Sequence, residues 1–178
     1  MSTSLTDKEY YQLTISVAKA LISQEVPIKP KHARATIIGT HHNNGAHAFW
    51  TIVIKQSIKD NRITAWKFCH VLHLILRDGH HLCLQHSIHH LERIAEIGKS
   101  SAGFHGGYGL CINQYTKLLV AKLNFHDRNS SFPGNLVLKQ QGELDQIVAC
   151  DIHYSYQLTI EMFDYLDEIL TLQTMGKN

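Results

Sequence analysis

The sequence predicts an all-α fold, a superhelical solenoid of about seven to eight antiparallel helices. Three observations lead to this prediction. Apolar residues recur at helical spacing along almost the whole chain. Helix start signals and turn signals separate the periodic segments. The connections between the segments are short, which favours antiparallel neighbours. Because the chain has 178 residues and is 44% hydrophobic, we expect residues 1–178 to form a single domain.

The first three helices are predicted from the signals at their ends. The first begins at a capping box, "TDKE" (residues 6–9), and ends at Val26-Pro27. Its apolar residues recur at helical spacing: Tyr11, Ile15, Ala18 and Ile22. The second begins near Pro30, a residue favoured in a first turn, and stops at residues 43–45. The third, "AHAFWTIVIKQ" (residues 46–56), contains β-branched residues that would also suit a strand.

The remaining helices are predicted from their periodicity and from the turns between them. Residues 62–79 are apolar on nearly every side, which indicates a helix buried among its neighbours. A fifth helix covers residues 81–97, and a sixth covers residues 108–129 and ends before the turn at residues 132–135. A last long helix is expected over residues 152–174. Its apolar stripe consists of Tyr156, Ile160, Phe163, Leu166 and Leu170.

The histidine-rich segment "HHLCLQHSIHH" (residues 80–90) suggests a metal site as one interpretation. Cys83, His86 and His90 repeat at helical spacing, which is compatible with zinc ligands. However, no carboxylate completes the set, and the sequence lacks the usual paired cysteines. We therefore expect surface histidines on a polar helix face, with no metal site and no cofactor.

The cysteines predict buried thiols in a reduced, cytosolic protein. They are widely spaced and form no CxxC pair: Cys69, Cys83, Cys111 and Cys150. Cys69 lies beside His70 and His73 in the most apolar helix, where no third group is present to activate a thiolate. We therefore expect no enzyme. We expect neither a signal peptide nor a membrane span, so any membrane contact would be peripheral.

Charge is distributed unevenly along the chain. Residues 1–142 hold sixteen Lys and Arg against eight Asp and Glu, whereas residues 143–178 hold one Lys against seven acidic residues. This asymmetry suggests an anionic partner for the first part of the chain. Because the basic residues are otherwise scattered, without interleaved aromatic residues, we do not expect nucleic acid to be that partner.

The basic residues gather where the first predicted helix ends and the second begins. Lys19 lies near the end of the first helix, while Lys29, Lys31 and His32 surround Pro30 at the start of the second. A helix start exposes unpaired N–H groups and the positive end of the helix dipole, so it attracts anions. Lysine suits phosphate groups because its compact charge sits on a flexible stem. The stretch therefore predicts a site for a multiply phosphorylated headgroup, with Lys8 as a peripheral contact on almost the same helix face.

The spacing of these basic residues resembles a known family signature. Lys19, nine intervening residues and then Lys29-Pro30-Lys31-His32 match the K-x9-K-x-[KR]-[HY] pattern of ANTH domains, the phosphoinositide-binding modules of clathrin adaptors. Four further segments resemble the huntingtin-interacting branch of that family, which includes its yeast actin-linking relatives: "KHARATIIGTHHNNGAHAFW", "WKFCHVLHLILRDGHH", "FPGNL" and "QLTIEMFDYLD". The similarity runs from about residue 19 to residue 170.

The resemblance implies a function and a set of partners. It implies an ENTH/ANTH/VHS-like helical fold that binds phosphatidylinositol bisphosphates, foremost the 4,5-isomer, through Lys19, Lys29, Lys31 and His32. It also implies a cytoplasmic protein, peripheral at clathrin-coated pits of the plasma membrane and on endocytic vesicles, with epsin-type ENTH adaptors as candidate partners. Family members continue with further helices, a coiled coil and an actin-binding module, so we expect a fragment or a short natural form. Clathrin and actin binding are expected only outside this chain.

A rival hypothesis belongs to another functional class. A helical scaffold could bind coat or cargo peptides in its grooves without intrinsic lipid affinity, with the basic turn as ordinary solvated surface. Vesicle binding distinguishes the two hypotheses.

Overall fold

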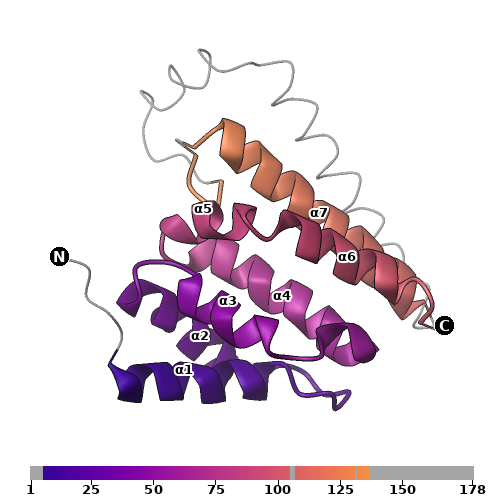
Figure 1. Cartoon of the computed structure of the whole chain (residues 1–178), viewed down its shortest axis with the longest axis horizontal. Helices are drawn as coiled ribbons and strands as arrows, with labels where there is room; N and C mark the ends of the chain where they lie inside the picture. Colours follow the sequence, from indigo (N-terminus) through magenta and orange to yellow (C-terminus); the bar gives the residue numbers. More distant parts are fainter. Residues whose placement is uncertain (1–5, 105–106, 131, 137–178) are drawn as a thin grey trace. The chain divides into compact units, whose positions relative to one another are not determined.

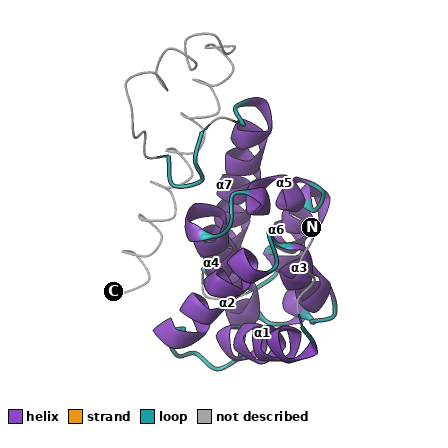
Figure 2. Cartoon of the chain, turned by 90° about the vertical axis from the view of Figure 1, so that its left-hand side faces the viewer, coloured by secondary structure: helices purple, strands orange, loops and turns teal. Residues whose placement is uncertain are grey.

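The computed structural model describes residues 6–104, 107–130 and 132–136. Within these ranges the chain forms seven α-helices, one short 3-10 helix and no strand (Figures 1 and 2). The all-α prediction is therefore confirmed. The chain divides into two compact units, Met1–Ser87 and Ile88–Asn178, and the boundary falls at the end of the fifth helix.

Unit 1 is built from five α-helices and the 3-10 helix. Their bounds are α1 (Asp7–Ala20), α2 (Pro30–His42), α3 (His47–Ile54), η1 (Ile58–Asp60), α4 (Arg62–Asp78) and α5 (Leu82–Ile88). α1 packs against α2 and α3, and α2 also packs against α4. The bounds of α2 and α4 match the prediction to within a few residues. The third segment forms a helix and not the alternative strand.

Large aromatic side chains form much of the core of unit 1. Phe49, Trp50 and Phe68 are at most 2% exposed, and Trp50 meets Phe68 edge to face with ring centroids 6.0 Å apart. The indole N–H of Trp50 donates a hydrogen bond of 3.0 Å to the buried hydroxyl of Ser87, which ties α3 to α5. Because a buried indole N–H without a partner is costly, this bond lets the sequence place tryptophan at a fully buried position.

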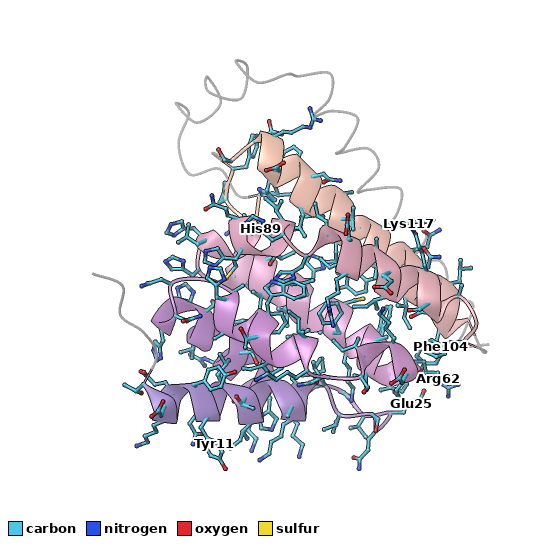
Figure 3. The ribbon with its side chains drawn as sticks, viewed as in Figure 1. Tyr11, Glu25, Arg62, His89, Phe104 and Lys117 are labelled. Carbon is cyan, nitrogen blue, oxygen red and sulfur yellow. The ribbon has the colours of Figure 1, made fainter. Side chains whose placement is uncertain are left out.

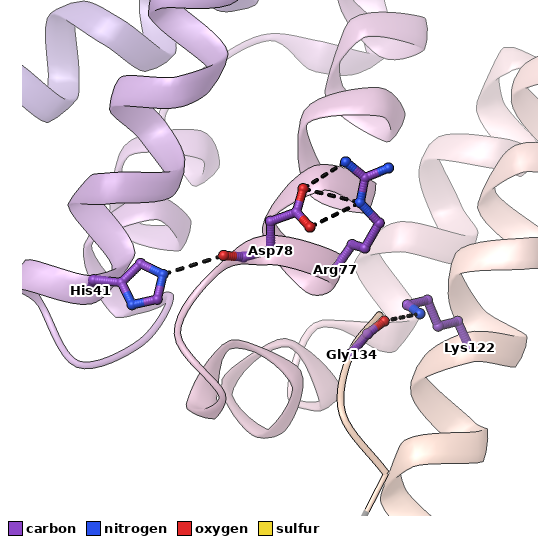
Figure 4. Close-up of polar contacts among 5 residues, drawn as sticks. All are labelled: His41, Arg77, Asp78, Lys122 and Gly134. Atoms are coloured by element: carbon purple, nitrogen blue, oxygen red, sulfur yellow. Dashed lines mark hydrogen bonds and ion pairs between the residues drawn. The ribbon is translucent and has the colours of Figure 1, made fainter. Parts of the chain in front are cut away.

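The ends of α2 and α4 are joined by a polar contact. A ring nitrogen of His41, Nε2, lies 3.2 Å from the backbone oxygen of Asp78 (Figure 4). The carboxylate of Asp78 is held in turn by the guanidinium of its neighbour Arg77 at 2.6 Å. This Arg77 contact lowers the pKa of Asp78, so the carboxylate stays charged beside the last turn of α4.

The start of α1 confirms the capping box. The hydroxyl of Thr6 accepts a hydrogen bond of 3.3 Å from the N–H of Glu9, and the Glu9 carboxylate accepts one of 2.9 Å from the N–H of Thr6. These bonds with Thr6 lower the pKa of Glu9. Two of the N–H groups at the helix start are thereby satisfied.

Two predictions for α1 are wrong. The helix ends at Ala20 and not at Val26, because the backbone beyond it is drawn into contact with α4. Its buried side is also different from the predicted apolar stripe. The buried residues are Leu13, Ser16, Val17 and Ala20, whereas Tyr11 and Ile22 are exposed. Both sets repeat at helical spacing, so packing against α2 decides which side is buried.

The predicted fifth helix is two helices. α5 ends at Ile88, the chain turns at His89 and His90, and α6 (Leu91–Ser101) begins in unit 2. Histidine is a weaker helix former than most residues around it, and two in succession lower the local preference for a continuous helix. The unit boundary coincides with this turn.

Unit 2 is described as α6 and the long helix α7 (Tyr108–Arg128), which pack closely together. A Cβ atom added at Gly98 would lie 2.0 Å from the hydroxyl oxygen of Thr116, so the close approach of the two helices requires glycine there. The expected turn after α7 is confirmed, because the N–H of Leu136 donates to the backbone oxygen of Pro133 at 2.9 Å. The helix expected over residues 152–174 lies outside the described residues.

Buried polar groups stabilise the end of α7. The ammonium group of Lys122 donates a hydrogen bond of 2.6 Å to the backbone oxygen of Gly134 (Figure 4). His126 lies one turn further along and is 3% exposed. Burial, together with the charge of Lys122, lowers the pKa of His126 to about 4, so this imidazole is neutral near pH 7.

Among the residues that the structure describes, no helix combines the length and apolar character needed to cross a bilayer.

Candidate functional site

Two contacts fix the antiparallel register of α1 and α2. Near the start of α1, the Glu9 carboxylate lies 3.7 Å from an imidazole nitrogen of His42, at the end of α2. Further along, a Cβ atom on Gly39 would lie 2.7 Å from a methyl group of Leu13, so the two helices approach closely at that point. Continuing this register by about 1.5 Å per residue along both helices brings Lys19 opposite the first turn of α2.

The start of α2 differs from an ordinary helix start. Its N-cap residue is Lys29, which makes no side-chain cap, and Pro30 follows at the first helical position. The lysine side chain has no acceptor atom, and the N–H groups of His32 and Ala33 donate instead to the backbone oxygen of Lys29, at 2.9 and 3.4 Å. The first turn also contains no acidic residue. The positive end of the helix dipole favours negative charge, but the charged side chains at this end are the cations of Lys29 and Lys31. The start of α2 is therefore expected to attract an anion from outside the chain.

The structure brings the four signature residues together around His32. The side chains of Lys19, Lys29 and Lys31 are exposed, and His32 is half-buried. Partial burial lowers the pKa of His32, and the nearby charges of Lys31, Lys19 and Lys29 lower it further. One imidazole therefore experiences three ammonium groups from two helices, which is the convergence expected from the sequence.

A buried lysine of α4 binds the backbone of the loop between α1 and α2. Lys67 of α4 is 4% exposed, and its ammonium group donates hydrogen bonds to the backbone oxygens of Ile22 at 3.0 Å and Gln24 at 2.7 Å. Burial lowers the pKa of Lys67. In Figure 3, Glu25 of the same loop and Arg62 of α4 lie side by side, with their charged groups 3.9 Å apart. The backbone between Lys19 and Lys29 is therefore fixed to α4.

Sequence reasoning missed Lys67 as part of the site. A single lysine within an apolar helix carries no signal of its contacts, and its partners lie more than forty residues away in the sequence. Arg34 was also missed. It is exposed and follows Lys31 by three residues, so it shares one side of α2 with that lysine.

Lys8 lies away from the cluster. It is exposed on α1, eleven residues before Lys19, which places the two on nearly the same side of the helix but about 16 Å apart along its axis. Lys8 can therefore reach the same surface as the cluster without joining it.

The histidines and cysteines considered as metal ligands or nucleophiles make hydrogen bonds and ring contacts or are buried as thiols. His86 accepts a hydrogen bond of 3.2 Å from the N–H of Ala46 and stacks on His47 with ring centroids 3.7 Å apart. Burial raises the pKa of the Cys83 thiol to about 11 and that of Cys69 still further. In the described part of the chain, no three His, Cys, Asp or Glu side chains are grouped so that they could hold a metal ion.

A groove of about 280 Å³ lies between α6 and α7 in unit 2. Two exposed lysines, Lys99 and Lys117, border it, together with the polar side chains of Asn113 and Asn124. Small side chains such as Ala95 and Ala121 also line it. The groove could accept a peptide side chain or an acidic group.

Known proteins resemble this chain in sequence and in structure. Huntingtin-interacting protein 1 of Homo sapiens is 41% identical over 163 residues, which are 91% of this chain and 16% of that protein. Endocytosis protein end4 of Schizosaccharomyces pombe is 31% identical over 163 residues, 88% of this chain and 14% of that protein. The chain thus spans about a sixth of the length of the curated relatives it matches.

A solved structure shows a similar fold and carries a ligand. The ENTH domain of epsin-2 in complex with phosphatidylinositol 4,5-bisphosphate superposes with a TM-score of 0.80 at 26% sequence identity, and the match covers 97% of this chain and 67% of that one. The fold is therefore of the ENTH type, and one of the relatives is named as an endocytosis protein. Residues 12–175 match the model of the ANTH domain, and the chain belongs to the ANTH domain family.

Proposed function

We propose that this chain binds phosphatidylinositol bisphosphate headgroups, with the 4,5-isomer as the first candidate, and that residues 1–178 act as one lipid-binding module. Lys19, Lys29, Lys31 and His32 contact the phosphates, and Lys8 adds a peripheral contact. The observation that carries the proposal is the gathering of three ammonium groups around a half-buried imidazole, at a helix start without a side-chain cap. The epsin-2 ENTH domain, which has a similar fold, binds the same lipid.

The expected strength of the site follows from its charges. Each basic residue near an anionic membrane surface contributes about 1 kcal/mol, so three lysines give roughly 3 kcal/mol. This corresponds to about a hundredfold gain in affinity. Hydrogen bonds from the ammonium group and the backbone N–H of Lys31 to phosphate oxygens add to this general attraction, because charge-assisted bonds are stronger than neutral ones.

The proposal includes a place of action. A headgroup site of this kind recruits the chain to the cytosolic leaflet of the plasma membrane, at coated pits and endocytic vesicles. ENTH adaptors are proposed as co-recruited partners on the same membrane. Clathrin and actin contacts would belong to other parts of the longer relatives.

Vesicle co-sedimentation tests the proposal. The wild-type chain should pellet with phosphatidylcholine vesicles that contain phosphatidylinositol 4,5-bisphosphate. The double variant Lys29→Glu with Lys31→Glu should lose roughly a hundredfold or more in affinity, since two attractions become repulsions. A matched control, Lys55→Glu with Lys99→Glu, makes the same change in net charge at two exposed lysines outside the signature. It should bind nearly as well as the wild type.

Two results would contradict the proposal. One is a wild-type chain that stays in solution at low salt with such vesicles. The other is equal loss of binding in both double variants, since net charge and not the signature would then govern the contact. Circular dichroism of all three proteins confirms that their helices are intact.

The groove between α6 and α7 favours a second function, a scaffold that binds coat or cargo peptides. Its lysines, Lys99 and Lys117, would select acidic peptides. If the wild-type chain ignores vesicles, and an acidic peptide binds it in a manner that Lys99→Glu abolishes, the scaffold function is the better one.

A further inference from the structure

Apolar side chains are exposed on α1 and on the loop that leads to the cationic cluster. Three large hydrophobic residues project from α1 and the loop that follows it: Tyr11 is 63% exposed, Ile22 37% and Val26 44%. Figure 3 shows Tyr11 on the outer side of α1. A single exposed apolar side chain is common on protein surfaces. Ile22 follows Lys19 by three residues and Val26 precedes Lys29 by three, so two of the three lie in the segment that joins these lysines, while Tyr11 lies on α1 between Lys8 and Lys19.

The phase of α1 organises its outer side into two rows. Tyr11 and Ala18 are seven residues apart, close to two full turns, so they lie on one side of the helix, while Ile22 lies beyond its end in the loop. Lys8 and Lys19 are eleven residues apart, close to three full turns, and form a second row, turned by about 60° to 80° from Tyr11. The exposed and half-buried residues on this side of α1 are Asp7, Lys8, Tyr11, Gln12, Ile15, Ala18 and Lys19, so two cations and one acidic residue flank its apolar side chains.

This pattern matches the chemistry of a bilayer surface. Cations attract anionic lipid headgroups, while an aromatic ring with a polar tip is favoured at the level of the headgroups. Lysine stems can lie along apolar surface while their charges reach phosphates. We infer that the outer side of α1 lies against an anionic bilayer, with the ring of Tyr11 at the interface and Ile22 and Val26 beside the headgroup site. This inference rests on the proposed lipid-binding function.

Substitution of Tyr11 distinguishes contact with the bilayer from recognition of the headgroup, because vesicles and the soluble headgroup can be tested separately. Titration with vesicles of phosphatidylcholine, phosphatidylserine and phosphatidylinositol 4,5-bisphosphate should show a three- to tenfold weaker affinity for Tyr11→Ala. Calorimetry with the soluble headgroup, inositol 1,4,5-trisphosphate, should give the same Kd for wild type and variant, because no bilayer is present. As a matched control, Leu110→Ala removes a side chain of α7 that is 52% exposed and should leave both affinities unchanged.

Fluorescence reports the depth of the contact. Tyr11→Trp should be quenched by vesicles made with brominated lipid, beyond the quenching of the native Trp50 and Trp66 in the wild-type chain. Leu110→Trp should show no added quenching. If the emission of Tyr11→Trp shifts with protein concentration in the absence of vesicles, a second copy of the chain covers this side, and the inference is overturned.

The outcomes distinguish failure of the inference from failure of the function. If the headgroup binds but Tyr11→Ala keeps full vesicle affinity, the bilayer contact is wrong and the headgroup site stands. If Tyr11→Ala weakens binding of the soluble headgroup equally, Tyr11 supports the headgroup site and the bilayer contact is again wrong. If the wild type binds neither headgroup nor vesicles, the proposed function fails and the inference fails with it.

Discussion

His32 connects the proposed site to pH. In the free protein, partial burial and then the charges of Lys31, Lys19 and Lys29 hold its pKa below the ordinary value of 6.5. A bound bisphosphate would reverse this effect, since negative charge favours the imidazolium and raises the pKa. The complex then holds more protons than the free chain. Affinity must therefore increase as pH falls through the interval between the two pKa values.

We predict that His32→Gln removes most of this proton linkage. Wild-type chain should take up protons on binding inositol 1,4,5-trisphosphate near pH 6, as measured by calorimetry in two buffers of different ionisation enthalpy. The headgroup phosphates also titrate in this range, so the variant serves as the reference for their share. Equal proton uptake by the two proteins would show that His32 is not in contact with the phosphates.

The connection between α1 and α2 is an element whose shape depends on a distant side chain. Lys67 reaches the backbone of Ile22 and Gln24 from α4, and both lie in the segment between Lys19 and Lys29. An ammonium group buried against carbonyl oxygens is costly to remove from water, which indicates that this contact fixes geometry more than it adds stability.

We predict that Lys67→Met weakens binding of the soluble headgroup about tenfold, because the freed loop no longer holds Lys19 and Lys29 in position. The melting temperature should change little, since the lost hydrogen bonds are offset by the removal of a buried charge. Lys67→Arg should restore part of the affinity. The matched control is Lys122→Met, which removes a lysine that is 5% exposed and donates to a backbone oxygen in unit 2.

Substitution of the two buried lysines, Lys67 and Lys122, should affect headgroup affinity differently. Lys122→Met should leave headgroup affinity at the wild-type level whatever its effect on melting. If Lys67→Met binds like the wild type, the loop holds its shape without the tether. If both variants weaken binding equally, general loss of stability and not loop position explains the effect.

Helices were predicted well where their end signals are local. The capping box at Thr6 and Pro30 at the start of α2 both act within one turn, so the sequence contains the whole cause. The end of α1 could not be predicted in this way, because the chain just beyond it contacts Lys67 of another helix. The break between α5 and α6 has only a weak local signal, two successive histidines, and it lies beside a unit boundary that depends on packing.

At the scale of the whole molecule, the charge and spacing of the basic residues were enough to predict which residues form the candidate site. Lys19, Lys29, Lys31 and His32 follow a family spacing, and the register of α1 against α2 brings them together as expected. The side of α1 that faces solvent was not predictable, because two apolar repeats compete for the core. The structure resolves this competition in favour of Leu13 and leaves the Tyr11 row exposed.

Because one headgroup site binds weakly, recruitment to a membrane should depend on how many copies of the chain are joined. A gain of about a hundredfold over a neutral surface is a weak hold for a single copy. Two copies joined by a linker that spans their sites would bind one membrane with a high effective concentration, so the overall affinity rises by a factor between about 10² and 10⁴. No new contact with lipid is needed for this gain.

We therefore predict that fusion of the chain to a parallel dimeric coiled coil raises vesicle affinity about a hundredfold or more at equal site concentration. The Kd per site for inositol 1,4,5-trisphosphate should stay the same, because a soluble headgroup cannot bridge two copies. A mixed dimer with Lys29→Glu and Lys31→Glu in one of its two chains should return to the affinity of the monomer. A dimer that binds vesicles no better than the monomer would contradict this prediction. It would show that the two headgroup sites cannot contact one membrane at the same time.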